Sequence, residues 1–112
     1  MLSDQRGPAI RAPAESGKER YHWRGIHPEF PTVVFLFETV VDDGEHWAIR
    51  HLELHTGGRV LRYWWEHLED RDGFLASAAL QPEEWGLERL TEAEFATEWA
   101  SSTGLADRRL AD

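Results

Sequence analysis

Histidine and glutamate alternate in the segment His51-Leu52-Glu53-Leu54-His55, and both residue types bind transition metals. On a β-strand, alternate residues rise by about 6.6–6.8 Å, so the two histidines would lie ~13 Å apart and could not share one ion. A metal site would need a further ligand from a neighbouring strand, such as His67. We therefore expect no metal and no cofactor, and we interpret the run as the polar face of a strand.

Glu38 is the one charged residue in the otherwise apolar segment 32–41. A buried carboxylate is costly unless it is paired or protonated, and Arg50 or Arg62 on adjacent strands could supply the partner. A structural ion pair is the simpler interpretation. The functional alternative makes Glu38 a general acid or base in a pocket with His51, because burial raises a carboxyl pKa towards neutrality.

The chain contains six tryptophans, and two of them, Trp64 and Trp65, are adjacent. Neighbouring side chains in a strand point to opposite faces, so one indole would enter the core while the other covers a second surface. An exposed tryptophan beside charged residues is typical of a protein interface. We predict that a binding surface is formed by Trp64, Trp65, Arg50, Glu53, Arg62, Glu66 and Glu69.

Several kinds of chemistry have no support in the sequence. The absence of cysteine excludes disulfides, thiolate catalysis and sulfur-ligated zinc. No serine lies in a nucleophile elbow, and no glycine-rich phosphate loop occurs. The sequence therefore favours a non-enzymatic protein, although it does not decide the question.

The charge of the chain is strongly negative. Twenty-one acidic and twelve basic residues give a formal net charge of −9, which repels nucleic acid and attracts a basic protein. The longest apolar run, residues 33–37, is far shorter than the ~20 residues of a membrane helix, and the first twenty residues lack the apolar centre of a secretory signal. We expect a cytoplasmic protein that binds neither nucleic acid nor membrane.

A chain of 112 residues predicts one domain. Residues 1–20 have the polar, Pro-rich and Gly-rich composition of a tail, residues 21–104 should form the domain, and residues 105–112 a short C-terminal tail. The predicted class is α+β, with an antiparallel sheet of about four to five strands closed by a C-terminal helix.

The strands are predicted from β-branched and aromatic runs bounded by turn residues. Their expected ranges are 21–24, 32–41, 46–55, 59–69 and, as a short closing strand, 87–90. The apolar run 32–41 should be central and covered on both faces. In 46–55, two leucines lie out of phase with Trp47 and Ile49, which predicts a β-bulge near Arg50.

The C-terminal helix has the clearest local signal. Thr91 and Glu94 have the spacing of a capping box, and Leu90 and Phe95 that of a hydrophobic staple. Phe95 and Trp99 lie four residues apart and should dock on the sheet. The helix is expected to begin at Glu92 and to end near Gly104, while 82–86 should form one helical turn and 74–80 stays ambiguous between helical turn and edge strand.

The order of these motifs resembles a family of small, uncharacterised bacterial proteins. In this chain the family's features are an N-terminal motif of Trp23, His27 and Pro31, a strand containing Glu38, hairpins at 42–44 and 57–59, Pro82-Glu83-Glu84, and a C-terminal motif from Leu90 to Phe95 with Trp99. The similarity covers residues 21–100 and implies an α+β fold without an assigned activity. Small acidic proteins of this kind are sometimes encoded beside toxins as immunity proteins.

Three functions are consistent with the sequence. The first is a non-enzymatic acidic module that binds a basic protein such as a toxin, in the manner of an immunity or antitoxin-like inhibitor. The second is a small-molecule-binding protein or an isomerase- or cyclase-like enzyme, with an aromatic pocket around Glu38, His51 and Trp64 or Trp65. The third is a homodimeric structural component that pairs through an edge strand.

Overall fold

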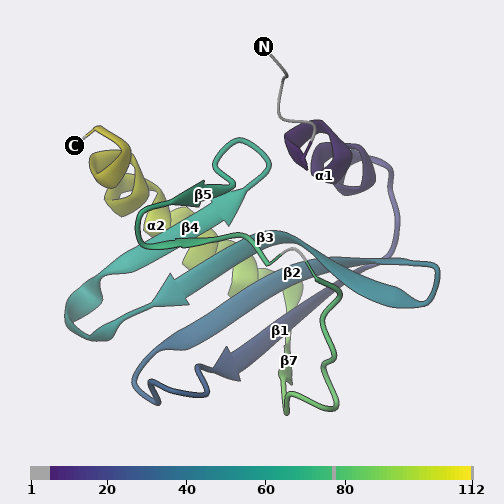
Figure 1. Ribbon diagram of the computed structural model, residues 1–112, viewed down its shortest axis with the longest axis horizontal. Coiled ribbons are helices and arrows are strands. Elements are labelled where there is room, and N and C mark those ends of the chain that lie inside the picture. The colour runs from purple at the N-terminus through teal and green to yellow at the C-terminus, as the bar shows by residue number, and fades with distance from the viewer. Residues whose placement is uncertain (1–5, 77, 112) are drawn as a thin grey trace.

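The computed structural model describes residues 6–76 and 78–111, and it contains a five-stranded sheet with two long helices (Figure 1). In chain order the elements are α1 (Arg6–Glu15), β1 (Arg20–Ile26), β2 (Val34–Asp42), β3 (Glu45–Leu54), the 3₁₀ turn η1 (Thr56–Gly58), β4 (Val60–Trp64), β5 (Glu69–Asp70), β6 (Gly73–Phe74), β7 (Glu88–Leu90) and α2 (Glu92–Ala111). The predicted α+β class is confirmed.

The main sheet is antiparallel, with the strand order β4-β3-β2-β1-β7, and β5 and β6 form a separate two-stranded ladder. The apolar strand β2 is therefore central, as predicted. The β2–β3 hairpin closes through Asp43 and Gly44, whose φ angles are 53° and 78°. Positive φ at both positions is the geometry of a type I′ turn, which matches the twist of the flanking strands.

A β-bulge divides β3, and it confirms the prediction for the region of Arg50. Thr39 pairs with Ala48 but Glu38 pairs with Arg50, so Ile49 is the extra residue. Because side chains alternate along a strand, the extra residue shifts the alternation, so that Arg50 and Leu52 lie on the same face of the sheet as Trp47. The bulge is therefore the reason that an arginine lies opposite Glu38.

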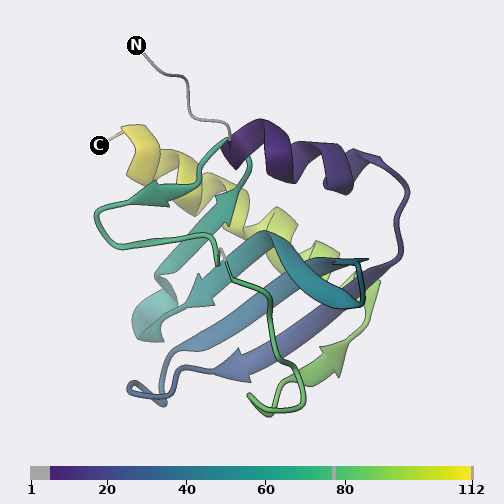
Figure 2. The same ribbon diagram turned by 45° about the vertical axis from the view of Figure 1, so that its right-hand side comes forward.

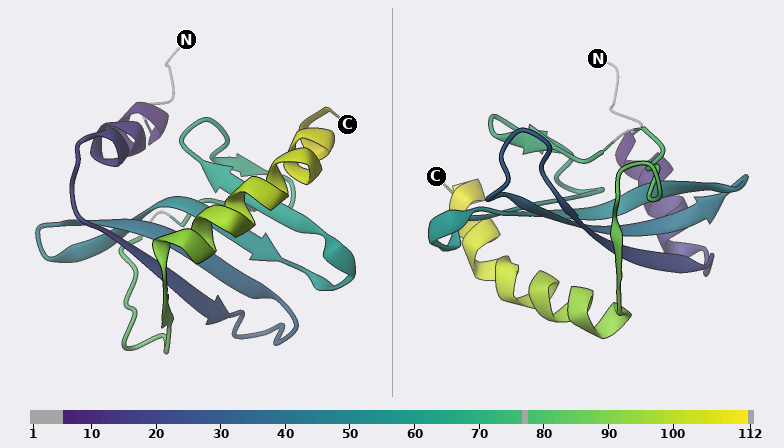
Figure 3. Two further views of the ribbon diagram at one scale, coloured as in Figure 1. Left: turned by 180° about the vertical axis from the view of Figure 1, so that it is seen from behind. Right: turned by 90° about the horizontal axis from the view of Figure 1, so that it is seen from below.

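Helix α2 covers one face of the sheet, which we call the helix face (Figure 3). The capping box forms at its start, since Thr91 N donates to Glu94 Oε1 and Glu94 N donates to Thr91 Oγ1, both at 3.0 Å. Phe95 is buried against Leu36 and Leu52, and the half-buried Trp99 packs beside them. The predicted docking of the helix is confirmed.

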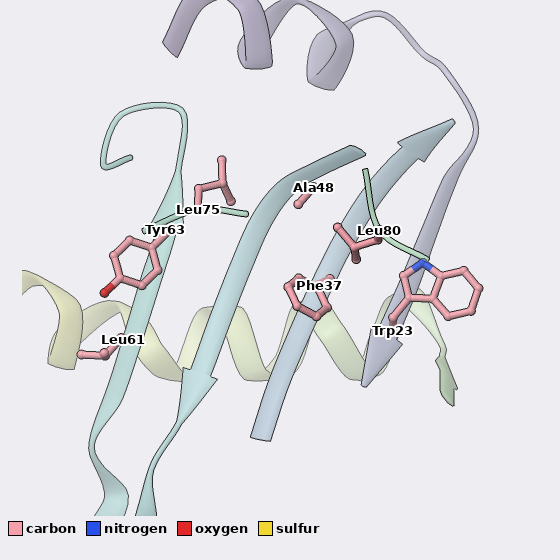
Figure 4. Close-up of a cluster of buried hydrophobic side chains, with 7 residues drawn as sticks. All are labelled: Trp23, Phe37, Ala48, Leu61, Tyr63, Leu75 and Leu80. Carbon is pink, nitrogen blue, oxygen red and sulfur yellow. The ribbon is translucent and has the colours of Figure 1, made fainter. Parts of the chain in front are cut away.

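The opposite face has no helix across its centre and is covered by the irregular chain between β4 and β7; we call it the loop face. Its apolar cluster joins side chains of four strands to Leu75 and Leu80 of that chain, with α2 behind the sheet (Figure 4). Residues 74–76 and 78–80 form neither a helical turn nor a continuous strand, and residue 77 of this predicted segment lies outside the described part of the chain. They contribute only the end of β6 and a bridge from Leu80 to His46.

The strand predicted for 59–69 is shorter than expected, because β4 ends at Trp64. There the chain turns: Trp64 N donates to His67 O at 3.2 Å, and His67 N donates to Trp64 O at 3.0 Å. Trp65 follows the end of the strand, so the alternation rule does not apply to the tryptophan pair. Both indoles lie on the helix face, with Trp64 against Trp99 and Trp65 against Arg50.

Both predicted tails contain helix. Ile10 and Ala14 lie four residues apart on α1 and pack on the sheet beside Val40 and Ile49, which explains why part of segment 1–20 is ordered against the domain. Residues 1–5 lie outside the described part. Helix α2 continues through Gly104 to Ala111, because an interior glycine costs only about 1 kcal/mol relative to alanine.

The packing of α2 on the sheet can be tested by substitution of Phe95. Phe95→Ala should lower the free energy of unfolding by about 3–5 kcal/mol, because it removes a buried ring between helix and sheet. Urea denaturation followed by circular dichroism would measure the change. Phe30→Ala is the matched control, since that ring is 57 % exposed. Equal losses in the two variants would contradict the docking of α2 through Phe95.

Candidate functional site

Glu38 lies at the centre of the helix face and is 5 % exposed. Its Oε2 lies 2.9 Å from His22 Nε2, and its Oε1 lies 3.4 Å from Arg20 Nη1 and 3.5 Å from Arg50 Nε. The carboxylate thus joins β1 and β3 across β2. The predicted ion pair with Arg50 is present.

The two arginines of the predicted surface lie against tryptophan rings on the same face. The guanidinium of Arg50 lies 5.4 Å from the Trp65 ring centroid and 5.2 Å from that of Trp99. The guanidinium of Arg62 lies 4.8 Å from the Trp64 centroid and 4.0 Å from that of Trp99. Cation–π contacts of this kind fix Trp99 of α2 on the sheet. The tryptophan pair therefore has a structural role that the sequence did not reveal.

His51 lies on the loop face, on the other side of the sheet from Glu38. It pairs with Phe37, the neighbour of Glu38 in β2, and its ring contacts Phe35, Phe37 and Tyr63. Among the residues that the structure describes, neither ring nitrogen has a hydrogen-bond partner, and burial lowers the His51 pKa to about 3. The pocket expected around Glu38 and His51 together is not formed, because the sheet separates the two side chains.

The other ionisable groups of the loop face bond to one another. His55 Nε2 lies 2.9 Å from Glu53 Oε1, while Asp70 accepts a bond from Tyr63 Oη and contacts His67 Nε2, both at 3.0 Å. Asp70 also accepts the backbone N–H groups of residues 72 and 73, so it holds the β5–β6 turn. Within residues 6–76 and 78–111, no group of three His, Asp or Glu side chains is placed to hold a metal.

The residues predicted as one binding surface are therefore spread over the molecule. Arg50, Arg62, Trp64 and Trp65 lie together on the helix face, half-buried, whereas Glu53 lies on the loop face. The remaining two members, Glu66 and Glu69, are exposed in the chain that follows β4.

A stronger surface feature extends from the chain before β7, through β7, into the first turns of α2, and the sequence prediction did not include it. Residues 83–98, the acidic segment, contain six glutamates and a single basic residue, Arg89. All six glutamates are exposed: Glu83, Glu84, Glu88, Glu92, Glu94 and Glu98. Trp85 lies among them and is 50 % exposed. The part of this segment before α2 runs along the β1 edge of the sheet, green in Figure 2.

Beside the acidic segment is a hollow of about 480 Å³, between the β2–β3 hairpin and residues 80–84. Trp23 and His46 line it together with three carboxylates, those of Glu45, Glu83 and Glu84. Burial and the nearby Arg89 lower the pKa of His46, which keeps the imidazole neutral at pH 7. The hollow therefore combines aromatic surface with negative charge.

The signal for this surface was present in the sequence as six glutamates in sixteen residues. One of these glutamates also has a local structural role, which the sequence predicted. Glu94 closes the capping box, and bonds from the backbone and hydroxyl of Thr91 lower its pKa. Only the structure shows that all six carboxylates and half of Trp85 are exposed, with Glu83 and Glu84 beside a hollow at Trp23 and Glu94 and Glu98 beside another at Leu36.

Comparison with protein-family models, with curated proteins and with solved structures found no match to this chain. Neither helix, over the described residues, has the length and apolar character that crossing a membrane requires.

His51 predicts a specific dependence of stability on pH. Its pKa is about 3 in the folded protein and ordinarily 6.5, so between these values only the unfolded chain takes up the proton. Stability should fall as the pH decreases through this window. Relative to His51→Phe, the wild-type protein should lose about 1.4 kcal/mol of unfolding free energy for each pH unit between pH 6 and pH 4.

Urea denaturation of both proteins across this range measures the difference. The other ionisable groups are common to the two chains, so their contributions largely cancel in the comparison. A difference that does not change with pH would contradict the burial of a neutral His51.

Proposed function

We propose that this chain is a non-enzymatic, cytoplasmic protein-binding module whose partner is a basic protein. The observation that carries the proposal is the acidic segment with the half-exposed Trp85 among its glutamates. Charge of one sign concentrated on a surface accelerates encounter with an opposite charge, and a tryptophan is the side chain that most often provides binding energy at an interface.

The hollow beside the segment supports the same choice of partner. Three carboxylates and the Trp23 ring surround a space that suits an arginine or lysine side chain of the partner. On the two sheet faces, by contrast, Glu38, His51, Glu53 and Asp70 take part in internal packing and bonding.

An inhibitor of the immunity or antitoxin type is the form of this function that we propose. The resemblance to small bacterial proteins favours it, and so does a net charge of −9, which suits the covering of a basic active site. The small-molecule alternative around Glu38, His51 and the tryptophan pair has less support, because its residues lie on two faces of the sheet.

The test compares two charge reversals of equal size after a partner has been isolated by pull-down from the source cell. Glu84→Lys with Glu88→Lys should lower the association rate constant on the order of tenfold at low salt. Glu66→Lys with Glu69→Lys makes the same change in net charge on the surface that the sequence predicted, and should have a much smaller effect. Both differences should shrink as salt shortens the screening length.

Trp85→Ala should act on dissociation instead. Loss of a central interface tryptophan costs about 2 kcal/mol or more, which corresponds to an off-rate raised on the order of 30-fold. Surface plasmon resonance measures both rate constants, and Phe74→Ala, which removes another exposed ring, is the control. Equal effects of the two charge reversals, or an unchanged off-rate in Trp85→Ala, would contradict binding through the acidic segment.

A further inference from the structure

An apolar hollow of about 320 Å³ lies between α1 and the N-terminal half of β3. It results from the end of β4, whose last residue, Trp64, pairs with Arg50. Beyond that pair β3 continues through Ile49 and Trp47, and α1 packs against it through Ile10 and Ala14. Helix α1 lies where a further strand could have paired with β3, but it does not fill that space completely. The hollow therefore remains between α1 and β3.

The residues that line this hollow are apolar with one exception. Of its eleven lining residues only Asp42 is charged, and the others are Ala, Ile, Pro, Val, Leu or Trp. Ile10 and Pro13 come from α1, and Leu68 and Leu75 from the chain around β5 and β6. The volume lies at the lower end of the range for small-molecule sites, about 300–1,000 Å³, and so suits a small ligand.

The charge around the hollow determines which class of small ligand it can bind. Asp42 is exposed, and it forms one ion pair within the described part of the chain, a contact at 3.5 Å with Lys18, whose side chain is 41 % exposed. An exposed pair at this distance is weak, so the carboxylate remains available to another cation. A carboxylate ligand would be repelled by Asp42 and by the net charge of −9, whereas an ammonium group would be attracted.

We propose that this hollow binds a small apolar amine, with its hydrocarbon body between α1 and β3 and its ammonium group at Asp42. Trp47, which is 38 % exposed, lines the same hollow and offers its ring to the ammonium group. The site is separate from the acidic segment and does not depend on the proposed protein partner.

The experiment uses three probes with similar bodies and different head groups: 2-phenylethylamine, 2-phenylethanol and 3-phenylpropionate. Isothermal titration calorimetry with the full chain should show saturable binding of the amine, weaker binding of the alcohol by about two- to fivefold, and weakest binding of the carboxylate. Asp42→Asn should remove the preference of the amine over the alcohol while the alcohol binds as before.

Two variants fill the hollow from different sides. Ala9→Trp on α1 and Ala76→Phe after β6 should each abolish binding of the amine, and Ala96→Trp, at an exposed position on α2, is the control that should leave it unchanged. Using two filling variants guards against failure of either one to fold. Absence of saturable amine binding, binding that survives both filling variants, or a carboxylate that binds as well as the amine would overturn the proposal.

Discussion

The carboxylate of Glu38 is the interaction on which the arrangement of the helix face depends. It is buried in the central strand and contacts cationic or ionisable groups of both neighbouring strands, Arg20, His22 and Arg50. A buried carboxylate without such partners would be protonated or expelled, so the charge and its cations must be placed together. Arg50, paired in this way, lies against the Trp99 ring of α2. One acidic residue thus connects three strands and, through an arginine, the helix.

The ionisable groups at the centre of the sheet and the glutamates of the acidic segment differ in their surroundings. At the centre of the sheet, Glu38 and His22 are buried as a pair, and His51 is kept neutral by burial. Around the edge, the glutamates of the acidic segment are exposed and have little positive charge beside them in the chain. The buried groups of the sheet contribute to the uniqueness of the fold, whereas the exposed glutamates determine which partners approach. This is why the proposed function rests on the surface charge and on Trp85, although Glu38 and His51 first suggested chemistry.

The sequence predicted well those features that depend on local rules. The Asp-Asp-Gly hairpin, the capping box at Thr91 and the bulge near Arg50 each follow from a few neighbouring residues, and all three are present. The candidate site was predicted less well, because it depends on which face each side chain occupies. Reciprocal backbone bonds end β4 at Trp64, and no alternation rule could then place Trp65. Likewise, predicting that Glu38 and His51 lie on opposite faces of the sheet requires the pairing register of β2 and β3, which the sequence alone does not show.

A double-mutant cycle between Glu38 and Arg50 tests the central claim most directly. The free energy of unfolding is measured for the wild type, Glu38→Gln, Arg50→Met and the double variant. Because the half-buried Arg50 lies beside the buried charge of Glu38, the double variant should be less destabilised than the sum of the single variants, with a coupling energy of about 1 kcal/mol. Additive effects, within about 0.5 kcal/mol, would show that the helix face does not depend on this pair.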